Sequence, residues 1–305
     1  MSSKNYLITI VGPTAIGKTA LSIQLANYFK ADIISSDSRQ FYKEMTIGTA
    51  VPDTDELGSA THHFIQNRSI FDDYNVGTFE RDALSKLDEL FQKNPVQIMV
   101  GGSGLYIDAV LKGLDYFPDV DPKIRAQLTY QLQEKGIESL QEKLKELDLE
   151  TYNSIAIDNP HRITRALEIC IGSKIPYSSF KNKPKTTRNF TAIKIGLTAD
   201  REIIYNRINT RVDNMLANGL VEEAKNLYIN KELNALQTVG YRELFSFFDG
   251  EFTQDFAISE IKKNTRRFAK RQSTWFKKDQ EILWFDYQTD INKIINKISD
   301  KINDI

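Results

Sequence analysis

Residues 7–26 read LITIVGPTAIGKTALSIQLA. Its centre, Gly12-Pro-Thr-Ala-Ile-Gly17-Lys18-Thr19, satisfies the pattern GxxxxGK[ST] of a phosphate-binding loop. The apolar residues 7–11 predict a buried strand before the loop, and residues 19–29 predict the helix after it. In this context the backbone N–H groups of residues 14–19 are expected to bind phosphate oxygens at the helix N-terminus. Lys18 would add a cation, and the Thr19 hydroxyl would ligate Mg²⁺.

Further strand patterns follow within the first hundred residues. Ile33-Ile34 predict a second buried strand that ends at Asp37, and residues 96–100 predict a third, closed by Gly101-Gly102-Ser103-Gly104. Residues 81–92 form an amphipathic helical pattern between them. This alternation predicts a parallel sheet covered by helices on both faces. Because ligands bind outside the carboxyl ends of such strands, the Gly12 loop, Asp37 and the Gly101 loop are expected to share one site.

The pattern changes after this part of the chain. Residues 121–191 are almost wholly helical in periodicity, with residues 184–187 closing the segment as a loop, and apolar residues 193–197 and 282–285 predict two more strands. We therefore predict an α/β fold with a P-loop NTPase-like parallel sheet core and a helical insertion. The core comprises residues 1–118 and 190–305, and the insertion comprises residues 119–189.

Composition and charge narrow the class of protein. The 305 residues carry a net charge of −1 and a single cysteine, Cys170. The chain shows neither a leader pattern nor an apolar run of about 18 residues, so we expect a soluble cytoplasmic protein without a membrane partner. Positive charge is concentrated between residues 260 and 280, in Lys262, Lys263, Arg266, Arg267, Lys270, Arg271, Lys277 and Lys278. Ile261, Phe268 and Trp275 form an apolar stripe in this segment that is expected to pack on the core, with Arg266, Lys270 and Lys277 facing outward.

The phosphate-binding loop alone does not decide the reaction. A kinase or ATPase usually has an acidic residue at the end of a neighbouring strand to hold magnesium, whereas the strand at 96–100 ends in Gly-Gly-Ser-Gly. The only acid in a comparable place is Asp37, which can be a metal carboxylate, a general base or a helix cap. His62 and His63 have no third ligand at metal-binding spacing and are expected to be hydrogen-bonded structural residues.

Several longer motifs occur in a fixed order along the chain. They are GPTAIGKT, SSDSRQFY (35–42), GTAVP (48–52), THHF (61–64), GGSGLY (101–106), NPHRITRALE (159–168), GYRE (240–243) and TRRFAKRQSTWF (265–276). In this combination the chain resembles the bacterial tRNA dimethylallyltransferases, also called tRNA isopentenyltransferases, over residues 6–277. Ser103 stands where that family usually has threonine, which keeps the hydroxyl.

The resemblance implies a specific reaction. The donor would be dimethylallyl diphosphate, and the acceptor would be N6 of the adenosine immediately 3′ of a tRNA anticodon, giving N6-isopentenyladenosine and diphosphate. The loop that binds the diphosphate would comprise Gly12, Pro13, Thr14, Ala15, Ile16, Gly17, Lys18 and Thr19, with Mg²⁺ on Thr19. Catalysis would depend on Asp37, Lys18, Thr19 and Arg211, with Asp37 accepting the N6 proton. Arg211 and Arg207, one helical turn apart, are candidates for a diphosphate clamp, and the alternative for both is a surface role.

The resemblance also implies how tRNA is bound. Residues from the core and the insertion would contact the anticodon stem-loop: Asp37, Ser38, Arg39, Gln40, Ser103, Arg125, His161, Arg162, Ile163, Thr164, Arg165, Gly240, Tyr241 and Arg242, with further contacts near Gln237. It favours outward contact of the basic segment 262–278 with phosphates, and we expect a monomer. Three alternatives are an adenylate isopentenyltransferase that uses free AMP, a P-loop nucleotide kinase, and a non-catalytic RNA-binding protein. The insertion argues against the AMP-using enzyme, and the Asp-Ser-Arg-Gln motif argues against the kinase. The complete phosphate loop together with Asp37 argues against a non-catalytic protein.

Overall fold

The computed structural model describes residues 4–182 and 187–303, which form two compact units. The first unit contains the chain up to Lys112 and from Arg188 onward, and Gly113–Thr187 forms the second. The second unit is therefore an insertion in the first. The sequence placed its start at residue 119, because residues 113–118 have no helical period. Phe117 nevertheless stacks on Tyr177, with ring centroids 4.6 Å apart, which ties this stretch to the second unit.

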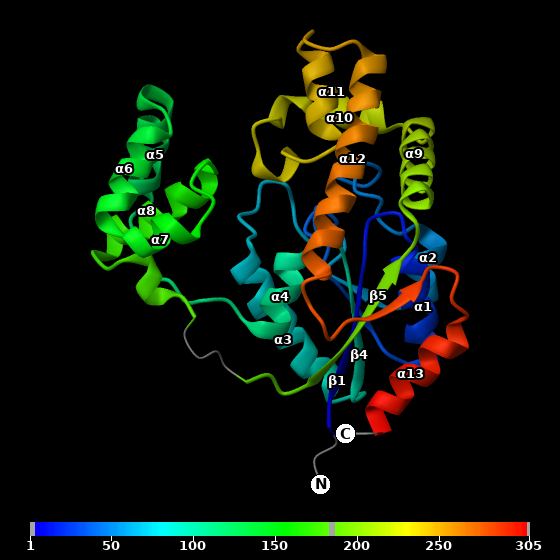
Figure 1. The fold of residues 1–305 in the computed structure, drawn as a ribbon. Coiled ribbons are helices and arrows are strands. Elements are labelled where there is room, and N and C mark those ends of the chain that lie inside the picture. The colour runs from blue at the N-terminus through cyan, green and yellow to red at the C-terminus, as the bar shows by residue number, and fades with distance from the viewer. Residues whose placement is uncertain (1–3, 183–186, 304–305) are drawn as a thin grey trace. The chain divides into compact units, whose positions relative to one another are not determined.

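The first unit is built on a six-stranded sheet with the order β3-β2-β4-β1-β5-β6, in which every described pair is parallel (Figure 1). The strands are β1 (Tyr6–Val11), β2 (Ile33–Ser35), β3 (His62–His63), β4 (Val96–Val100), β5 (Thr191–Thr198) and β6 (Leu283–Asp286). The prediction that the second strand ends at Asp37 is wrong by two residues, because the neighbouring strand β4 ends at Val100, which pairs with Ser35. Strand β3 was not predicted, since two residues are too few to show a period.

Helices follow the strands and cover both faces of this sheet (Figure 1). Helix α3 begins five residues before the predicted residue 81, because the Asn75 side chain caps it by accepting the N–H groups of Gly77 and Thr78. The helices of this unit are α1 (Lys18–Phe29), α2 (Thr54–Ser59), α3 (Val76–Phe91), α4 (Gly104–Lys112), α9 (Arg201–Ala217), α10 (Leu220–Leu227), α11 (Tyr241–Phe248), α12 (Gln254–Phe276) and α13 (Ile291–Asn303), with short 3₁₀ turns η2 (Tyr228–Asn230) and η3 (Asn234–Leu236). Across residues 4–182 and 187–303, no helix has both the length and the apolar character that a membrane span requires.

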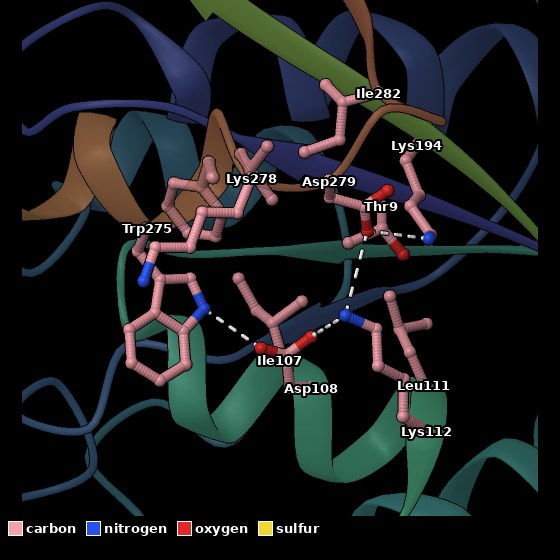
Figure 2. Close-up of a pocket in the computed structure, with 12 residues that line it drawn as sticks. Thr9, Ile107, Asp108, Leu111, Lys112, Lys194, Trp275, Lys278, Asp279 and Ile282 are labelled. Carbon is pink, nitrogen blue, oxygen red and sulfur yellow. Dashed lines mark hydrogen bonds and ion pairs between the residues drawn. The ribbon is translucent and has the colours of Figure 1, made fainter. Parts of the chain in front are cut away.

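A network of ion pairs connects α4, β5 and the segment after α12 (Figure 2). Lys112 on α4 lies 2.7 Å from Asp108 and 3.7 Å from Asp279. Lys194 on β5 is 2.7 Å from the same Asp279 carboxylate. These pairs fix the C-terminal end of α12 against the sheet.

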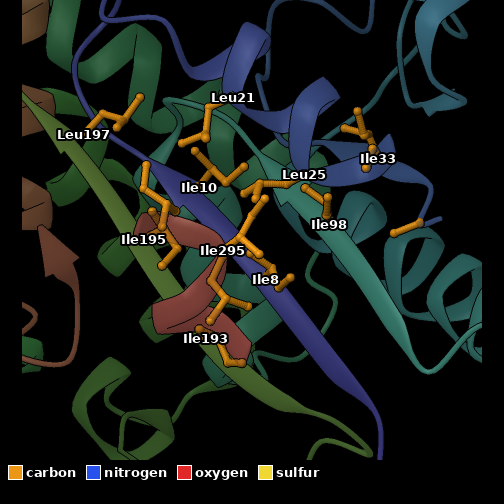
Figure 3. Close-up of a cluster of buried hydrophobic side chains, with 14 of the residues drawn as sticks. Ile8, Ile10, Leu21, Leu25, Ile33, Ile98, Ile193, Ile195, Leu197 and Ile295 are labelled. Carbon is orange, nitrogen blue, oxygen red and sulfur yellow. The ribbon is translucent and has the colours of Figure 1, made fainter. Parts of the chain in front are cut away.

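The hydrophobic core follows the alternation of side chains along the strands. Ile8 and Ile10 of β1 point to one face and pack with Leu21 and Leu25 of α1 and Ile295 of α13 (Figure 3). Leu7 and Val11 point to the other face, against α3 and α4. The alternation puts apolar residues on both faces, which explains why the sequence of β1 is almost continuously apolar.

The insertion is a helical unit with its own core. It contains α5 (Pro122–Lys135), α6 (Glu138–Leu147), α7 (Leu149–Ser154), α8 (Pro160–Ser173) and the 3₁₀ turn η1 (Tyr177–Phe180). Leu128, Leu140, Leu144, Ile163 and Leu167 are buried at its centre. Of the loop predicted at 184–187, residues 184–186 lie outside the described residues.

Candidate functional site: two adjoining cavities at the phosphate-binding loop

The loop between β1 and α1 is shaped by its glycines. Gly12 has φ +143°, and a Cβ there would come within 2.6 Å of the Leu197 carbonyl oxygen on β5. Gly17, at φ +110°, precedes the first turn of α1. Lys18 folds back across the loop and donates from Nζ to the carbonyl oxygens of Gly12 at 3.0 Å and Pro13 at 2.8 Å. The loop therefore has the strand-turn-helix geometry of an anion-binding site.

Gln272 of α12 completes this loop; it lies in the motif at residues 265–276, but no role was predicted for it. Its Oε1 accepts the N–H of Thr14 at 2.8 Å, and its Nε2 donates to the Gly102 carbonyl at 3.0 Å. An ideal Cβ at Gly102 would lie 2.1 Å from this Nε2, so the second glycine of the Gly101 loop makes room for Gln272. The Thr14 N–H, expected in the phosphate cradle, is thus already engaged within the protein.

The loop forms the wall of a cavity of about 710 Å³. Lys18, Thr19, Asp37, Arg207 and Arg211 all line it, so the structure brings together the predicted catalytic residues and both clamp candidates. Arg211 donates from Nη1 to the Thr14 hydroxyl at 3.3 Å, and Arg207 donates from Nε to the Ala15 carbonyl at 2.7 Å. Both arginines of α9 therefore contact the loop itself. Two loop side chains, those of Pro13 and Ile16, are buried, so Ile16 can offer only its backbone, and Gly12 and Pro13 do not line this cavity.

Burial makes this cavity strongly favourable for an anion. It lowers the pKa of Lys18 to about 8, while Asp37 acts to raise that pKa and Arg211 to lower it. Burial also lowers the pKa of Arg211, against the opposing effect of Asp37. Desolvated cations gain most from an anion that replaces the lost water, so the cavity suits a phosphate or diphosphate group.

A second cavity, of about 520 Å³, adjoins the first. The two share Thr14, Asp37, Thr49 and Arg211 in their walls, which places Asp37 where they meet. The Asp37 carboxylate accepts the N–H of Arg39 at 3.1 Å. The residues that follow form a turn and not a helix, so a helix-cap role for Asp37 is excluded.

Ser38 and Ser103 lie together in the wall of the second cavity. The Ser103 hydroxyl accepts the Ser38 N–H at 3.1 Å and donates to the Ser38 hydroxyl at 3.1 Å. Gln237, Gly240 and Arg242 line the same cavity. These predicted RNA-contacting residues come from three distant parts of the sequence.

Arg39 and Gln40 are held by contacts within the protein. Arg39 donates to the carbonyls of Asn234 at 2.9 Å and Ala235 at 3.0 Å, and burial lowers its pKa. Gln40 donates to the carbonyls of Thr49 at 3.2 Å and Ala50 at 2.8 Å. Each nevertheless lines a cavity, Arg39 the second and Gln40 the first, so both side chains stabilise the walls of the site.

Tyr241 is a correction to the predicted RNA contacts. Its side chain is fully buried, and its hydroxyl donates to Glu223 at 2.7 Å. The same carboxylate accepts the N–H groups of Thr46, Ile47 and Gly48. A Cβ at Gly48 would lie 2.6 Å from the Tyr241 ring, so these residues join two motifs in the core. Glu223 belongs to no motif, and the sequence offered no signal for it.

In the insertion, the predicted residues of α8 divide by helical period. His161 and Arg162 are exposed, whereas Ile163 and Thr164 are buried in the core of this unit. The prediction that Ile163 and Thr164 contact RNA is therefore wrong for their side chains. Arg125 and Arg165 both approach the buried carboxylate of Glu168, at 3.2 and 3.0 Å, which gathers two guanidinium groups on one surface of the insertion.

The basic segment of α12 differs from its prediction at Arg266, Phe268 and Trp275. Arg266 turns inward and donates to Asn209 at 2.8 Å, whereas Lys270 and Lys277 are exposed. Ile261 is buried, but Phe268 is 38% exposed and Trp275 is 41% exposed. Both aromatic side chains line the second cavity. The stripe does not pack wholly on the core, because its C-terminal part passes the mouth of this cavity.

His62 and His63 lie in the edge strand β3. His63 Nε2 is 2.7 Å from Asp32, and His62 Nδ1 is 2.8 Å from the Ala60 carbonyl oxygen. Among residues 4–182 and 187–303, no three His, Cys, Asp or Glu side chains are grouped so that they could hold a metal ion. A metal ion in the cavity of the phosphate-binding loop would therefore need oxygen atoms from a bound ligand in addition to those of the protein.

The family model of the IPP transferases matches residues 40–279. A tRNA dimethylallyltransferase of Flavobacterium psychrophilum is 64% identical over 304 residues, covering 98% of this chain and 99% of the relative. One from Christiangramia forsetii is 63% identical over 299 residues, covering 98% and 99%.

Two solved structures are similar to this chain over nearly its whole length. The tRNA isopentenylpyrophosphate transferase of Bacillus halodurans aligns with a TM-score of 0.74 at 35% identity, covering 99% of this chain and 98% of that one. A eukaryotic dimethylallyltransferase acting on tRNA aligns with a TM-score of 0.81 over 98% of this chain and 80% of the other. Its identity is 24%, so this likeness concerns the fold alone.

Proposed function

This chain belongs to the IPP transferase family, and on that basis we propose that it is a tRNA dimethylallyltransferase. It transfers a dimethylallyl group from dimethylallyl diphosphate to N6 of the adenosine immediately 3′ of the anticodon. The products are N6-isopentenyladenosine and diphosphate. The observation that carries this proposal is the position of Asp37, where a cationic cavity at the phosphate-binding loop meets a second cavity.

The two cavities suit the two substrates. The diphosphate occupies the cavity of the loop, where Lys18, Arg211 and backbone N–H groups meet its negative charge. The target adenosine enters through the second cavity, which is large enough for a base extruded from an RNA loop. Asp37 then faces both the reacting amine and the site of the leaving group.

The chemistry is a displacement at the allylic carbon. The N6 amine forms a bond to C1 of the dimethylallyl group as the bond from C1 to the diphosphate oxygen breaks. The electron pair of that bond leaves with the diphosphate, whose growing charge is stabilised by Lys18 and Arg211. Asp37 accepts the proton that N6 loses. Because an adenine amine is a weak nucleophile, placement of both substrates also supplies much of the rate.

We propose Mg²⁺ as the cofactor, which the Thr19 hydroxyl would hold together with oxygen atoms of the substrate. Thr19 and Asp37 line the same cavity. This fits Mg²⁺, which usually binds through a few protein oxygen atoms and the phosphates of a substrate. When bound, the ion neutralises charge on the leaving group.

The contacts with the anticodon stem-loop, the oligomeric state and the cellular location are also proposals. The exposed His161 and Arg162 of the insertion and Arg242 of the core are suited to contacts with the anticodon stem-loop. We also propose that the protein acts as a monomer. A cytoplasmic location is supported by the single cysteine, which is buried and free.

One assay separates this function from its alternatives. Purified protein is incubated with labelled dimethylallyl diphosphate and either a tRNA or AMP, and in parallel with ATP and AMP. We expect label in the tRNA alone, at one adenosine. Transfer to AMP would instead support an adenylate isopentenyltransferase, phosphate transfer from ATP a nucleotide kinase, and RNA binding without transfer a non-catalytic protein.

We expect binding of the donor to weaken as the pH rises through about 8. The pKa of Lys18 in the free protein is lowered to about 8 by burial, so the cation is present below this pH and lost above it. Affinity should then fall by up to about tenfold for each pH unit above that value, since binding must restore the proton. Calorimetric titration of the protein with dimethylallyl diphosphate from pH 6.5 to 9.5 measures this. Lys18→Met should bind weakly with no such slope, and an unchanged slope in this variant would assign the titration to another group.

We expect affinity for tRNA to fall steeply with salt if the exposed lysines of α12 contact phosphates. Lys270 is exposed, so Lys270→Ala should weaken binding of all tRNA substrates alike and lower the salt slope by about one. Lys297→Ala, on the exposed side of α13, is the matched control and should leave the slope unchanged. The measurement is a binding titration at several salt concentrations. An equal slope for the Lys270→Ala variant and the unmodified protein would show that this face does not meet RNA.

A further inference from the structure

The mouth of the second cavity carries three exposed apolar side chains. Leu105, Phe268 and Trp275 are 48%, 38% and 41% exposed, and all three line the cavity. Phe268 and Trp275 are seven residues apart on α12, so they lie on one side of the helix two turns apart. Large apolar side chains kept in water beside a cavity indicate a surface that a ligand covers.

Trp275 is fixed in its position from two directions. Its Nε1 donates to Asp108 on α4 at 2.9 Å, and the other oxygen of Asp108 pairs with Lys112 at 2.7 Å (Figure 2). Gly104 lies against the ring, since a Cβ there would be 2.4 Å from the Trp275 Cδ1 atom. An indole with its N–H bound and one edge packed against backbone has little rotational freedom. Its ring is therefore held in one orientation, in the walls of the second cavity and of a neighbouring cavity of about 210 Å³ that Figure 2 draws.

The position of this ring indicates what it binds. The reacting adenosine must reach Asp37, at the inner end where the two cavities meet, whereas Trp275 and Phe268 remain partly in water at the mouth. Extruding one base from an RNA loop leaves the neighbouring bases without a stacking partner. Aromatic side chains replace such stacking and tolerate any base, because every base has a π-face.

We propose that Trp275 is a stacking platform for an unpaired base adjacent to the acceptor adenosine, and that Asp108 is a positioning residue that orients its indole. This proposal rests on the proposed function, because it assumes an RNA acceptor. Phe268 lies two turns along α12 from the platform, with the Arg271 guanidinium 5.7 Å from its ring, and lines the same cavity. The platform determines how well the acceptor RNA binds and has no part in the bond that forms.

The protein contains two tryptophans, which allows a direct test. Trp284 lies in β6 and packs on Gly196, away from the cavity linings, so Trp284→Phe leaves Trp275 as the only indole. Titrating this variant with an anticodon stem-loop RNA should quench its fluorescence through stacking. Dimethylallyl diphosphate alone should produce no comparable quenching. Unchanged Trp275 emission at RNA concentrations that saturate binding would overturn the proposal.

Kinetics provide a second readout. Trp275→Leu should raise the KM for the RNA by on the order of ten- to a hundredfold, with kcat and the KM for the donor nearly unchanged. Trp275→Phe should restore most of the affinity, since it keeps the stacking face. Asp108→Ala should raise the RNA KM less than Trp275→Leu and reduce the quenching, whereas Asp108→Asn keeps an acceptor for the indole N–H and should change both less.

The outcomes also separate this proposal from the function on which it rests. Absence of transfer to RNA by the unmodified protein would reject the proposed function. Normal transfer together with an unchanged RNA KM in Trp275→Leu would reject the platform alone. A raised KM for the donor in place of the RNA would assign Trp275 to the prenyl group and would likewise overturn the proposal.

Discussion

Replacing Asp37 with asparagine is expected to lower the single-turnover rate of transfer by roughly 10²- to 10⁴-fold, the range typical of a lost general base. Asparagine keeps the shape of the side chain and an oxygen that can accept the Arg39 N–H, as Asp37 does at 3.1 Å, so the turn after β2 should persist. Affinity for the RNA should change little. The measurement is a rapid-quench assay with enzyme in excess over the RNA.

The pH of this experiment matters, because Asp37 acts to raise the pKa of Lys18. The variant should lose the Lys18 proton at a lower pH than the unmodified protein, so the comparison is made near pH 6.5, where both carry it. Asp300→Asn, at an exposed position of α13, makes the same chemical change and should have no effect. A normal single-turnover rate in Asp37→Asn would leave Asp37 only an orienting role.

Replacing Lys18 with methionine is expected to lower turnover by roughly 10²- to 10³-fold, the effect of removing one group that stabilises charge in the transition state. The Lys18 ammonium lies in the wall of the loop cavity and reaches the carbonyls of Gly12 and Pro13. Without it, the departing diphosphate loses a desolvated cation. Binding of the donor should also weaken, whereas binding of the RNA should not.

The same substitution should make the protein more stable. The Lys18 pKa falls from 10.5 to about 8 on folding, so folding disfavours its charged form. Below pH 8 the full penalty lowers the free energy of unfolding of the unliganded protein. The penalty is relieved as the pH rises toward 10.5. Lys18→Met should therefore raise the free energy of unfolding at pH 7 by on the order of 2 kcal/mol, a gain that declines at higher pH.

Chemical denaturation of Lys18→Met at pH 7 and 9.5 tests this, with Lys297→Met as the control at an exposed position. The two effects together distinguish loss of function from loss of structure. A Lys18→Met protein that is both inactive and less stable than the unmodified one would show that Lys18 mainly supports the fold.

The sequence predicted the elements whose side chains repeat regularly and the residues whose type is tied to one chemistry. Strands such as β4 are short, nearly continuous apolar runs, and the amphipathic helices of the insertion carry a clear period. The motif GxxxxGK[ST] has one well-defined conformation. Strand β3 was missed because its two residues depend on pairing with β2, which is a long-range contact. Helix α3 was predicted too short because its first turn depends on the Asn75 cap and not on apolar residues.

For the site, sequence reasoning named the residues but not their orientation. It grouped Tyr241, Ile163 and Thr164 with neighbours that do face outward, since a motif does not record which side of a helix is buried. It also gave no role to Glu223 and Gln272, whose importance lies in accepting or donating hydrogen bonds to backbone groups far away in the chain. Such contacts depend on tertiary structure and leave no local pattern.

Gln272 has a consequence for how this site can change during evolution. Its amide joins the Thr14 N–H to the Gly102 carbonyl, and any Cβ at residue 102 would collide with it. A larger residue at 102 is therefore tolerated only with a smaller one at 272, and a smaller one leaves the Thr14 N–H without its acceptor. Positions 102 and 272 are therefore expected to be inherited together, whereas position 14 contributes only its backbone N–H, which any residue except proline supplies.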